Sequence, residues 1–246
     1  MGASKRFFEV TTKIEHLTKE LDTKIIGHRM NRKDILVNSV FPLYVTDMMS
    51  EFFFHEVDSE YIPKGTVDYY GRFDANDKSV HIEIIHNPED TEYRWTAPLW
   101  GYIRGVYFDT ISHEMVHIYQ NERRKETGIT DTQRNPTKKE FKCLYRDDEA
   151  ENGLYLISPD EVEAHSYNFA SQLFRRYRSV EDALQALRTG KFDSIETFDF
   201  YVNYIKKNSY VYKRLMKKTT WYLLNKYDEN TYKNSECNED VVENNQ

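Results

Sequence analysis

Two histidines four positions apart, with an acid directly after the first, form the strongest chemical signal in the chain. They are His113, Glu114 and His117 in the stretch TISHEMVHIYQ. On a helix, residues four apart lie on the same face, so both imidazoles can bind one metal ion. Glu114 lies about 100° around the helix, where its carboxylate can reach a water molecule beside the metal. This arrangement is typical of zinc hydrolases, in which the acid is the general base. The alternative is a pair of core histidines satisfied by hydrogen bonds.

The sequence around the motif predicts one long, largely apolar helix from about residue 98 to residue 124. Its apolar positions indicate that the histidines face the interior. Gly101 and Gly105 would allow a helix or strand to approach closely. The apolar residues of this helix are Ile103, Val106, Ile111, Met115, Val116 and Ile118.

A catalytic zinc site needs a third protein ligand, and the stretch SPDEVEAHSYNFA is where we expect it. Ser158 at the N-cap and Glu161 three residues later predict a capping box, which gives Glu161 a local structural role. Glu163 has no such role and lies on the same side as Tyr167, so burial of its charge would require compensation, for which a metal ion is suitable. We therefore predict Glu163 as the third ligand. Glu161, Asp160 and His165 are the alternatives.

Both stretches together resemble the zincin metallopeptidases whose third ligand is a glutamate on the next helix. In DEVEAHSYNFASQLF, residues Glu163, Ala164, Phe169 and Ala170 resemble the E-A-x-x-F-A-x-x-L pattern of the small ImmA/IrrE-type peptidases, with four residues in place of two between Ala164 and Phe169. The HEM-x-H form, with Val116 where a glycine is usual, is more similar to SprT-type proteins, which use a third histidine. The resemblance covers residues 65 to 175. It implies a sheet whose edge strand holds an extended peptide substrate above the metal.

The mechanism implied by this resemblance is zinc-dependent hydrolysis of a peptide bond, with one Zn²⁺ per chain bound by His113, His117 and Glu163. Glu114 would take the proton of the attacking water and return it to the leaving amine. Tyr167 and His165 are the candidates for stabilising the oxyanion, chosen from their position. The expected partner is therefore a protein or peptide substrate.

The remaining pattern predicts an α+β protein: a small antiparallel or mixed sheet of the zincin type, packed on the active-site helix, with additional N- and C-terminal helices. We expect a first helix over residues 4–26, ending at Gly27, and a second helical stretch from residue 31, interrupted at Pro42, to residue 57. Residues 68–85 read as strand, turn and strand, and GLYLIS as a further short strand before the helix with the third ligand. The expected divisions are a helical region at 1–60, the peptidase domain at 61–233 and an acidic, disordered tail at 234–246.

Composition excludes several classes of protein. The formal net charge of −7 and the two cysteines argue against a dedicated nucleic-acid binder, a disulfide framework and a Cys-ligated zinc ribbon. No apolar run reaches the roughly 18 residues of a membrane span, and we expect a cytoplasmic protein that does not bind membranes. The charged stretch at 126–151 is long for a loop and suggests either a functional flap or a partly disordered segment.

Three other functions remain open from the sequence. One is a regulatory binding protein that has kept the peptidase scaffold without turnover, although the presence of Glu114 favours catalysis. The second is metal-assisted hydrolysis of a substrate that is not a peptide. The third involves the C-terminal segment at 206–227, where lysines alternate with Tyr210, Tyr212 and Trp221. Basic residues interleaved with aromatic rings can hold a nucleic acid, although a solvated face of an amphipathic helix explains the same pattern.

Overall fold

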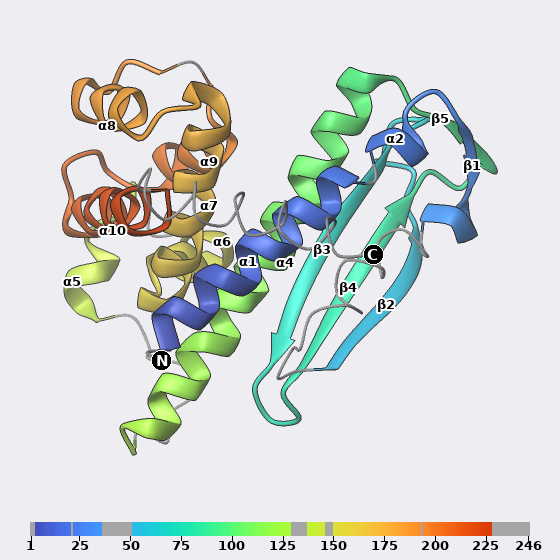
Figure 1. Cartoon of the computed structure of the whole chain (residues 1–246). Helices are drawn as coiled ribbons and strands as arrows, with labels where there is room; N and C mark the ends of the chain where they lie inside the picture. The colour runs from blue at the N-terminus through green and yellow to red at the C-terminus, as the bar shows by residue number, and fades with distance from the viewer. Residues whose placement is uncertain are drawn as a thin grey trace, which may run out of the picture. The chain divides into compact units, whose positions relative to one another are not determined.

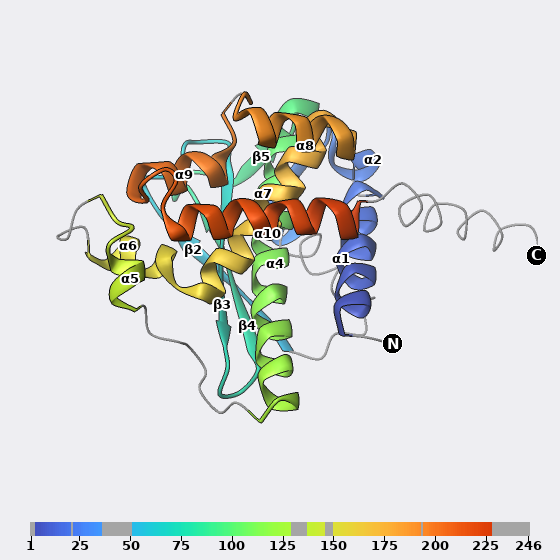
Figure 2. The same cartoon turned by 90° about the vertical axis from the view of Figure 1, so that its left-hand side faces the viewer.

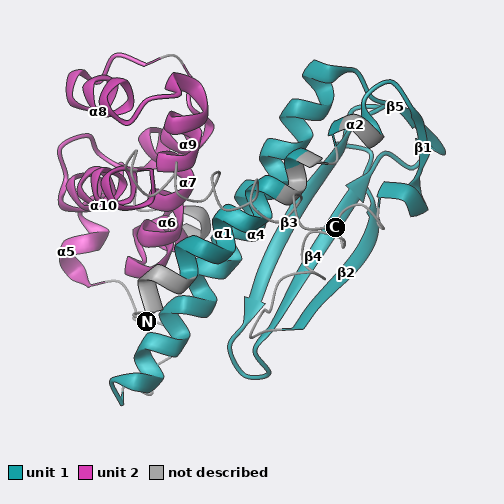
Figure 3. Ribbon diagram, viewed as in Figure 1, with its two compact units in different colours: residues 1–132 teal, residues 133–246 magenta. Residues whose placement is uncertain are grey.

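The computed structural model describes residues 3–20, 22–35, 51–128, 137–145, 150–192 and 194–227. The chain divides into two compact units, Met1–Thr132 and Gln133–Gln246 (Figure 3). The predicted tail at 234–246 lies outside the described residues, as do parts of the charged stretch at 126–151. The expected domain boundaries at residues 60 and 233 stay predictions.

A three-stranded sheet forms one layer of the first unit, with β4 (Ser79–His86) at its centre. β3 (Val67–Asp74) pairs with β4 antiparallel, as the strand–turn–strand pattern predicted. β2 (Glu51–Asp58) pairs with the other side of β4 in parallel. Alternation along β4 directs Val80, Ile82 and Ile84 to one face, where all three are fully buried. The sheet is therefore mixed, and its core face is set by a period of two.

The long helix α4 (Ala97–Glu126) packs against β3, and the helix α1 (Ala3–Glu20) packs against α4 (Figure 1). Thr96 caps α4, because its side chain accepts a hydrogen bond from the backbone N–H of Leu99 at 3.4 Å. Ile103 and Ile111 on α4 are fully buried. The predicted long helix is thus confirmed, and the first predicted helix is confirmed over residues 4–20.

Two short elements complete the first unit. The helix α2 (Asp22–Ile25) ends before Gly27, whose φ of 81° favours glycine. β1 (Arg29–Asn31) then pairs antiparallel with β5 (Glu92–Arg94). Asp22 fixes α2 to α4, because its carboxylate accepts hydrogen bonds from Trp100 Nε1 at 2.8 Å and from Arg104 Nη1 at 2.6 and 2.7 Å.

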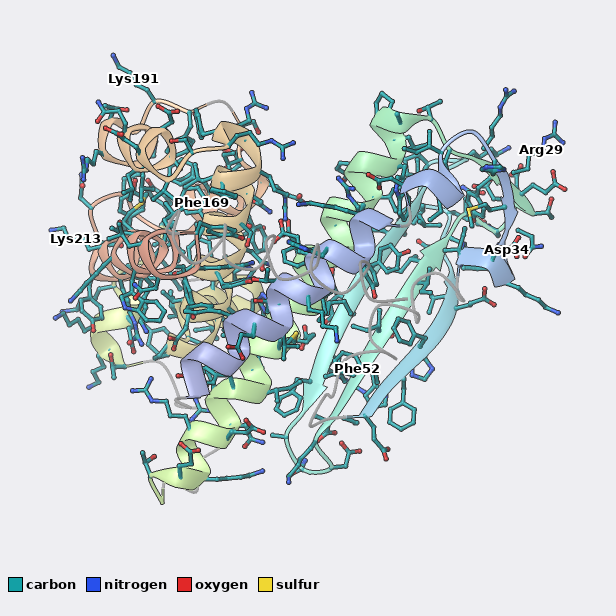
Figure 4. The ribbon with its side chains drawn as sticks, in the orientation of Figure 1. Arg29, Asp34, Phe52, Phe169, Lys191 and Lys213 are labelled. Atoms are coloured by element: carbon teal, nitrogen blue, oxygen red, sulfur yellow. The ribbon has the colours of Figure 1, made fainter. Side chains whose placement is uncertain are left out.

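The described part of the second unit is built from helices around α7 (Pro159–Tyr177), as Figure 2 shows. Its neighbours α6 (Ala150–Ile157), α8 (Val180–Thr189), α9 (Glu196–Tyr204) and α10 (Tyr210–Lys226) all pack on it. The short helix α5 (Lys138–Phe141) contacts α6 and α10. Phe169 of α7 lies inside this unit, fully buried and stacked on Phe198 at a centroid distance of 5.5 Å (Figure 4).

Two predictions of secondary structure were wrong. Residues 51–58, expected to continue a helix, form strand β2, since pairing with β4 outweighs the local helical pattern. The preceding part of that expected helix, residues 36–50, lies outside the described residues. The apolar stretch GLYLI, expected to be a strand, belongs to the helix α6. A short apolar run cannot distinguish the two states by periodicity alone.

Candidate metal centre

Helix α4 carries the two histidines and the acid on its buried side. His113 is 7% exposed and Glu114 4% exposed. One helical turn separates the two imidazoles, whose ring centroids lie 4.9 Å apart with an interplanar angle of 76°. The rings therefore lie near each other without stacking face to face, a geometry that suits two nitrogen ligands of one ion.

Gln120 determines which ring nitrogen of neutral His117 carries the proton. His117 Nδ1 lies 2.9 Å from Gln120 Oε1, which can only accept a hydrogen bond. The proton of the neutral imidazole is therefore on Nδ1, and Nε2 keeps its lone pair. A histidine that binds a metal through Nε2 needs this tautomer, commonly fixed by a hydrogen bond to an oxygen.

Glu114 of α4 lies against β3 at Gly71. A Cβ atom added to Gly71 would lie 2.8 Å from both Cγ and Oε1 of Glu114 and 2.9 Å from Thr110 Cγ2. No side chain larger than hydrogen fits there unless the helix or the strand shifts or the side chains of Glu114 and Thr110 turn away. The absence of a side chain at Gly71 thus sets the distance between the strand and the carboxylate.

Further contacts hold the strand in this register on the helix. The hydroxyl of Thr110 donates a hydrogen bond to the backbone carbonyl of Tyr69 at 3.3 Å. The ring of Tyr69 packs edge to face on Tyr107 with 5.2 Å between centroids. Within the described residues, β3 is an edge strand of the sheet order β2-β4-β3. The edge strand therefore runs past the acid of the motif.

In the second unit, Glu163 of α7 forms an ion pair with α10. Its Oε1 accepts a hydrogen bond from Lys218 Nζ at 2.6 Å, and the Glu163 side chain is 14% exposed. The charge compensation that the sequence argument assigned to a metal ion is supplied here by a lysine. The ion pair uses Oε1 of Glu163, so a metal ion could bind only its second carboxylate oxygen or displace the lysine, and Glu163 as a ligand stays a prediction.

Glu161 has a different environment on the same helix. Ser158 begins α7 without a side-chain capping hydrogen bond, so the capping box predicted for Ser158 and Glu161 does not form. Two residues on a helix correspond to about 200° of rotation, so Glu161 and Glu163 point to nearly opposite sides of α7. Glu161 is 4% exposed. The pKa of Tyr201 is raised well above its ordinary value, mainly because Tyr201 is buried and secondly because the negative charge of Glu161 is near.

The remaining candidates of α7 lie in aromatic surroundings. His165 packs edge to face on Tyr155 and Tyr201, with centroid distances of 6.0 and 5.4 Å. Tyr167 is fully buried, and its hydroxyl oxygen accepts a hydrogen bond from Lys226 Nζ. Asp160 is 8% exposed. These contacts account for the packing of His165 and Tyr167 within the helical unit, while their catalytic roles stay predictions.

Three residues of importance to the site were not recognised from the sequence. Gln120 was detectable in principle, because a residue three positions after His117 lies on the same helical face. Gly71 and Lys218 were not, since each meets its partner only through tertiary packing. Close approach was expected at Gly101 and Gly105 instead. An added Cβ at either of these has no described atom within 4 Å.

Comparisons with models of protein families, with curated proteins and with solved structures give no match for this chain. Among the described residues, no helix is both long enough and apolar enough to cross a membrane. The function is therefore argued from the chemistry of the side chains.

Proposed function

We propose that this protein is a zinc-dependent metallopeptidase that hydrolyses peptide bonds in a protein or peptide substrate. The observation that carries the proposal is the arrangement on α4: two imidazoles one turn apart, with His117 held in the tautomer that leaves Nε2 unprotonated. An acid directly beside them, buried and packed against an edge strand, fits a general base.

We further propose Glu161 as the third ligand, in place of Glu163. The ion pair with Lys218 and the rotation of about 200° between the two acids support this choice. Together with His113 and His117, Glu161 would complete a set of donors suited to a metal ion. Two imidazoles and one carboxylate are the ligand set of many catalytic zinc sites.

Each residue then has a defined role in the reaction. A bound zinc ion would supply Lewis acidity toward water and toward the carbonyl of the scissile bond. Glu114 takes a proton from the attacking water onto its carboxylate and delivers it to the nitrogen of the leaving amine. Gln120 keeps His117 in the required tautomer.

The edge strand β3 offers a way to bind the substrate. An extended peptide that pairs with β3 would form backbone hydrogen bonds with little demand on its sequence. Because Gly71 lies against Glu114, the peptide bond opposite that position would come to the general base. This explanation predicts a substrate that is unfolded or extended at the cleavage site.

Metal analysis of purified protein tests the ligand set. The wild type should contain about one zinc per chain, and His117→Ala should lose it. Glu161→Gln and Glu163→Gln form a matched pair on one helix. Removal of a residue that only hydrogen-bonds to a metal ligand costs about 10- to 100-fold in metal affinity. Removal of a ligand itself should therefore cost at least about 100-fold. We expect this loss for Glu161→Gln only. The reverse result would restore Glu163 as the ligand.

Cleavage of a labelled, unfolded protein tests the catalytic role. Glu114→Gln should retain zinc and lose at least about 100-fold in rate, because general base catalysis contributes about 10²- to 10⁴-fold. A zinc-loaded protein with the same rate before and after this substitution would contradict the peptidase proposal. Zinc binding without any cleavage by the wild type would favour the regulatory alternative.

A further inference from the structure

A lysine-rich surface with exposed aromatic rings covers one side of the second unit. On α10, five residues share an arc of about 80°, given about 100° of rotation per residue. All five are exposed, and they are Tyr210, Lys213, Lys217, Trp221 and Leu224. The opposite side of α10 packs on α7 and α8. The exposed stripe is thus fixed in place by the core.

Neighbouring segments extend this stripe with more positive charge. Lys139 of α5 lies over the ring of Tyr210, with Nζ 4.3 Å from the centroid. Lys206 Nζ donates a hydrogen bond to the backbone carbonyl of Lys142 at 3.2 Å, which links the loop before α10 to the end of α5. We call this surface the basic face. Its lysines are Lys138, Lys139, Lys142, Lys206, Lys207, Lys213 and Lys217.

The positive charge of the basic face is not neutralised within the described chain. None of its seven lysines forms an ion pair with a described residue, in contrast to Lys218, which pairs with Glu163. Residues 205–227 contain no acid. The acid of α5, Glu140, is 2% exposed and closes the capping box with Thr137. A net charge of −7 for the whole chain therefore coexists with a local basic surface.

The position of the aromatic rings indicates the kind of polyanion. Tyr210 is 45% exposed and Trp221 is 40% exposed, and they lie at about 16 Å from each other along α10, with Lys213 and Lys217 between them. Single-stranded nucleic acids offer both phosphates for lysines and unstacked bases for rings. A duplex would leave the rings without partners. A membrane surface requires a continuous apolar face, whereas lysines occupy the middle of this stripe.

We propose that the basic face binds single-stranded nucleic acid, with Lys213 and Lys217 on the phosphates and Trp221 stacked on a base. Figure 4 shows Lys213 pointing outward from α10. This function is independent of the proposed metal site. No residue of the basic face belongs to the metal ligands or to the catalytic residues.

Fluorescence anisotropy with the full chain and a labelled 20-nucleotide single strand, at 50 and 200 mM salt, tests this proposal. The double variant Lys213→Gln/Lys217→Gln should reduce the slope of log K against log salt concentration by about 1.4, since each phosphate contact contributes about 0.7 in single strands. Trp221→Ala should weaken binding by about 5- to 150-fold with an unchanged slope. Lys33→Gln/Lys191→Gln, two exposed lysines elsewhere, is the matched control and should bind as the wild type.

Several results would overturn the proposal: no binding by the wild type at 50 mM salt, equal losses in the control and the basic-face variant, or tighter binding to a duplex, to poly-glutamate or to vesicles of anionic lipid. Circular dichroism should show the wild-type helix content in the lysine and tryptophan variants, because their substituted side chains are exposed. Glu114→Gln should bind the single strand as the wild type does, which separates this test from that of the peptidase proposal.

Discussion

Substitution of Gly71 by alanine should disturb the candidate active site with a single methyl group. The added carbon would lie 2.8 Å from Cγ and Oε1 of Glu114. Ordinary van der Waals contact begins at 3.4 Å, so strand and helix must separate by roughly 0.6 Å or the carboxylate must turn away. Since a misplacement of about 1 Å can cost about 100-fold in rate, we expect kcat/KM to fall by about 10- to 100-fold.

Stability provides a second readout that does not depend on any activity. Overpacking costs about 1–3 kcal/mol, and the smaller conformational entropy of unfolded alanine returns about 0.5–1 kcal/mol. The free energy of unfolding, measured with urea, should therefore fall by about 1–2 kcal/mol in Gly71→Ala. The affinity for zinc should change little, because His113 and His117 are untouched.

Gly105→Ala is the matched control, because it adds the same methyl group to α4 at a position with no described atom within 4 Å of the new carbon. It should gain about 0.5–1 kcal/mol in stability, as alanine is the better helix former, and keep its activity. The reasoning would be refuted if Gly71→Ala were as stable and as active as the wild type. Equal damage from both substitutions would also refute it.

Three further predictions concern the first unit. Ile82→Ala in the central strand removes a fully buried side chain and should lower the free energy of unfolding by about 2–5 kcal/mol in urea titrations; a loss below 1 kcal/mol would mean that the sheet core is loosely packed. Asp22→Ala leaves the buried Trp100 Nε1 without its acceptor and should cost about 1–3 kcal/mol, while Asp22→Asn should cost less. Burial lowers the pKa of His86 below 6.5. The unfolded chain therefore binds this proton first, and stability should decline as the pH falls below about 6.5. In His86→Gln, the free energy of unfolding from denaturation curves should fall less between pH 7.5 and pH 5 than in the wild type. An equal fall in both proteins would refute the role of His86.

The sequence predicted those elements whose pattern is local and strong. The hairpin of β3 and β4 was expected because Val80, Ile82 and Ile84 alternate with polar residues. In β4 a single face is buried, so the sequence records the burial directly. The helix α4 was expected from the length of its helical pattern, although residues 111–116 are buried all around the helix.

Elements and contacts that depend on distant partners were not predictable in this way. Strand β2 pairs in parallel with β4, and its residues Phe52, Phe53 and Phe54 carry no alternation that would reveal it. The ion pair between Glu163 and Lys218 joins residues 55 positions apart. Without knowledge of such a partner, a semi-buried acid on α7 suggested a metal ligand. The proposal of Glu161 over Glu163 as the ligand therefore depends on tertiary contacts that the sequence does not reveal.

The place of β4 in the middle of its sheet has a consequence for synthesis of the chain. Both β2 and β3 precede β4 in the sequence, yet each pairs with β4 and not with the other. During translation the two earlier strands must wait unpaired until residues 79–86 leave the ribosome. They include Phe52 (Figure 4) and the two phenylalanines that follow it. Unpaired strand edges are prone to aggregate. A pause in translation just before Ser79 should therefore harm the yield of native protein more than a pause after His86.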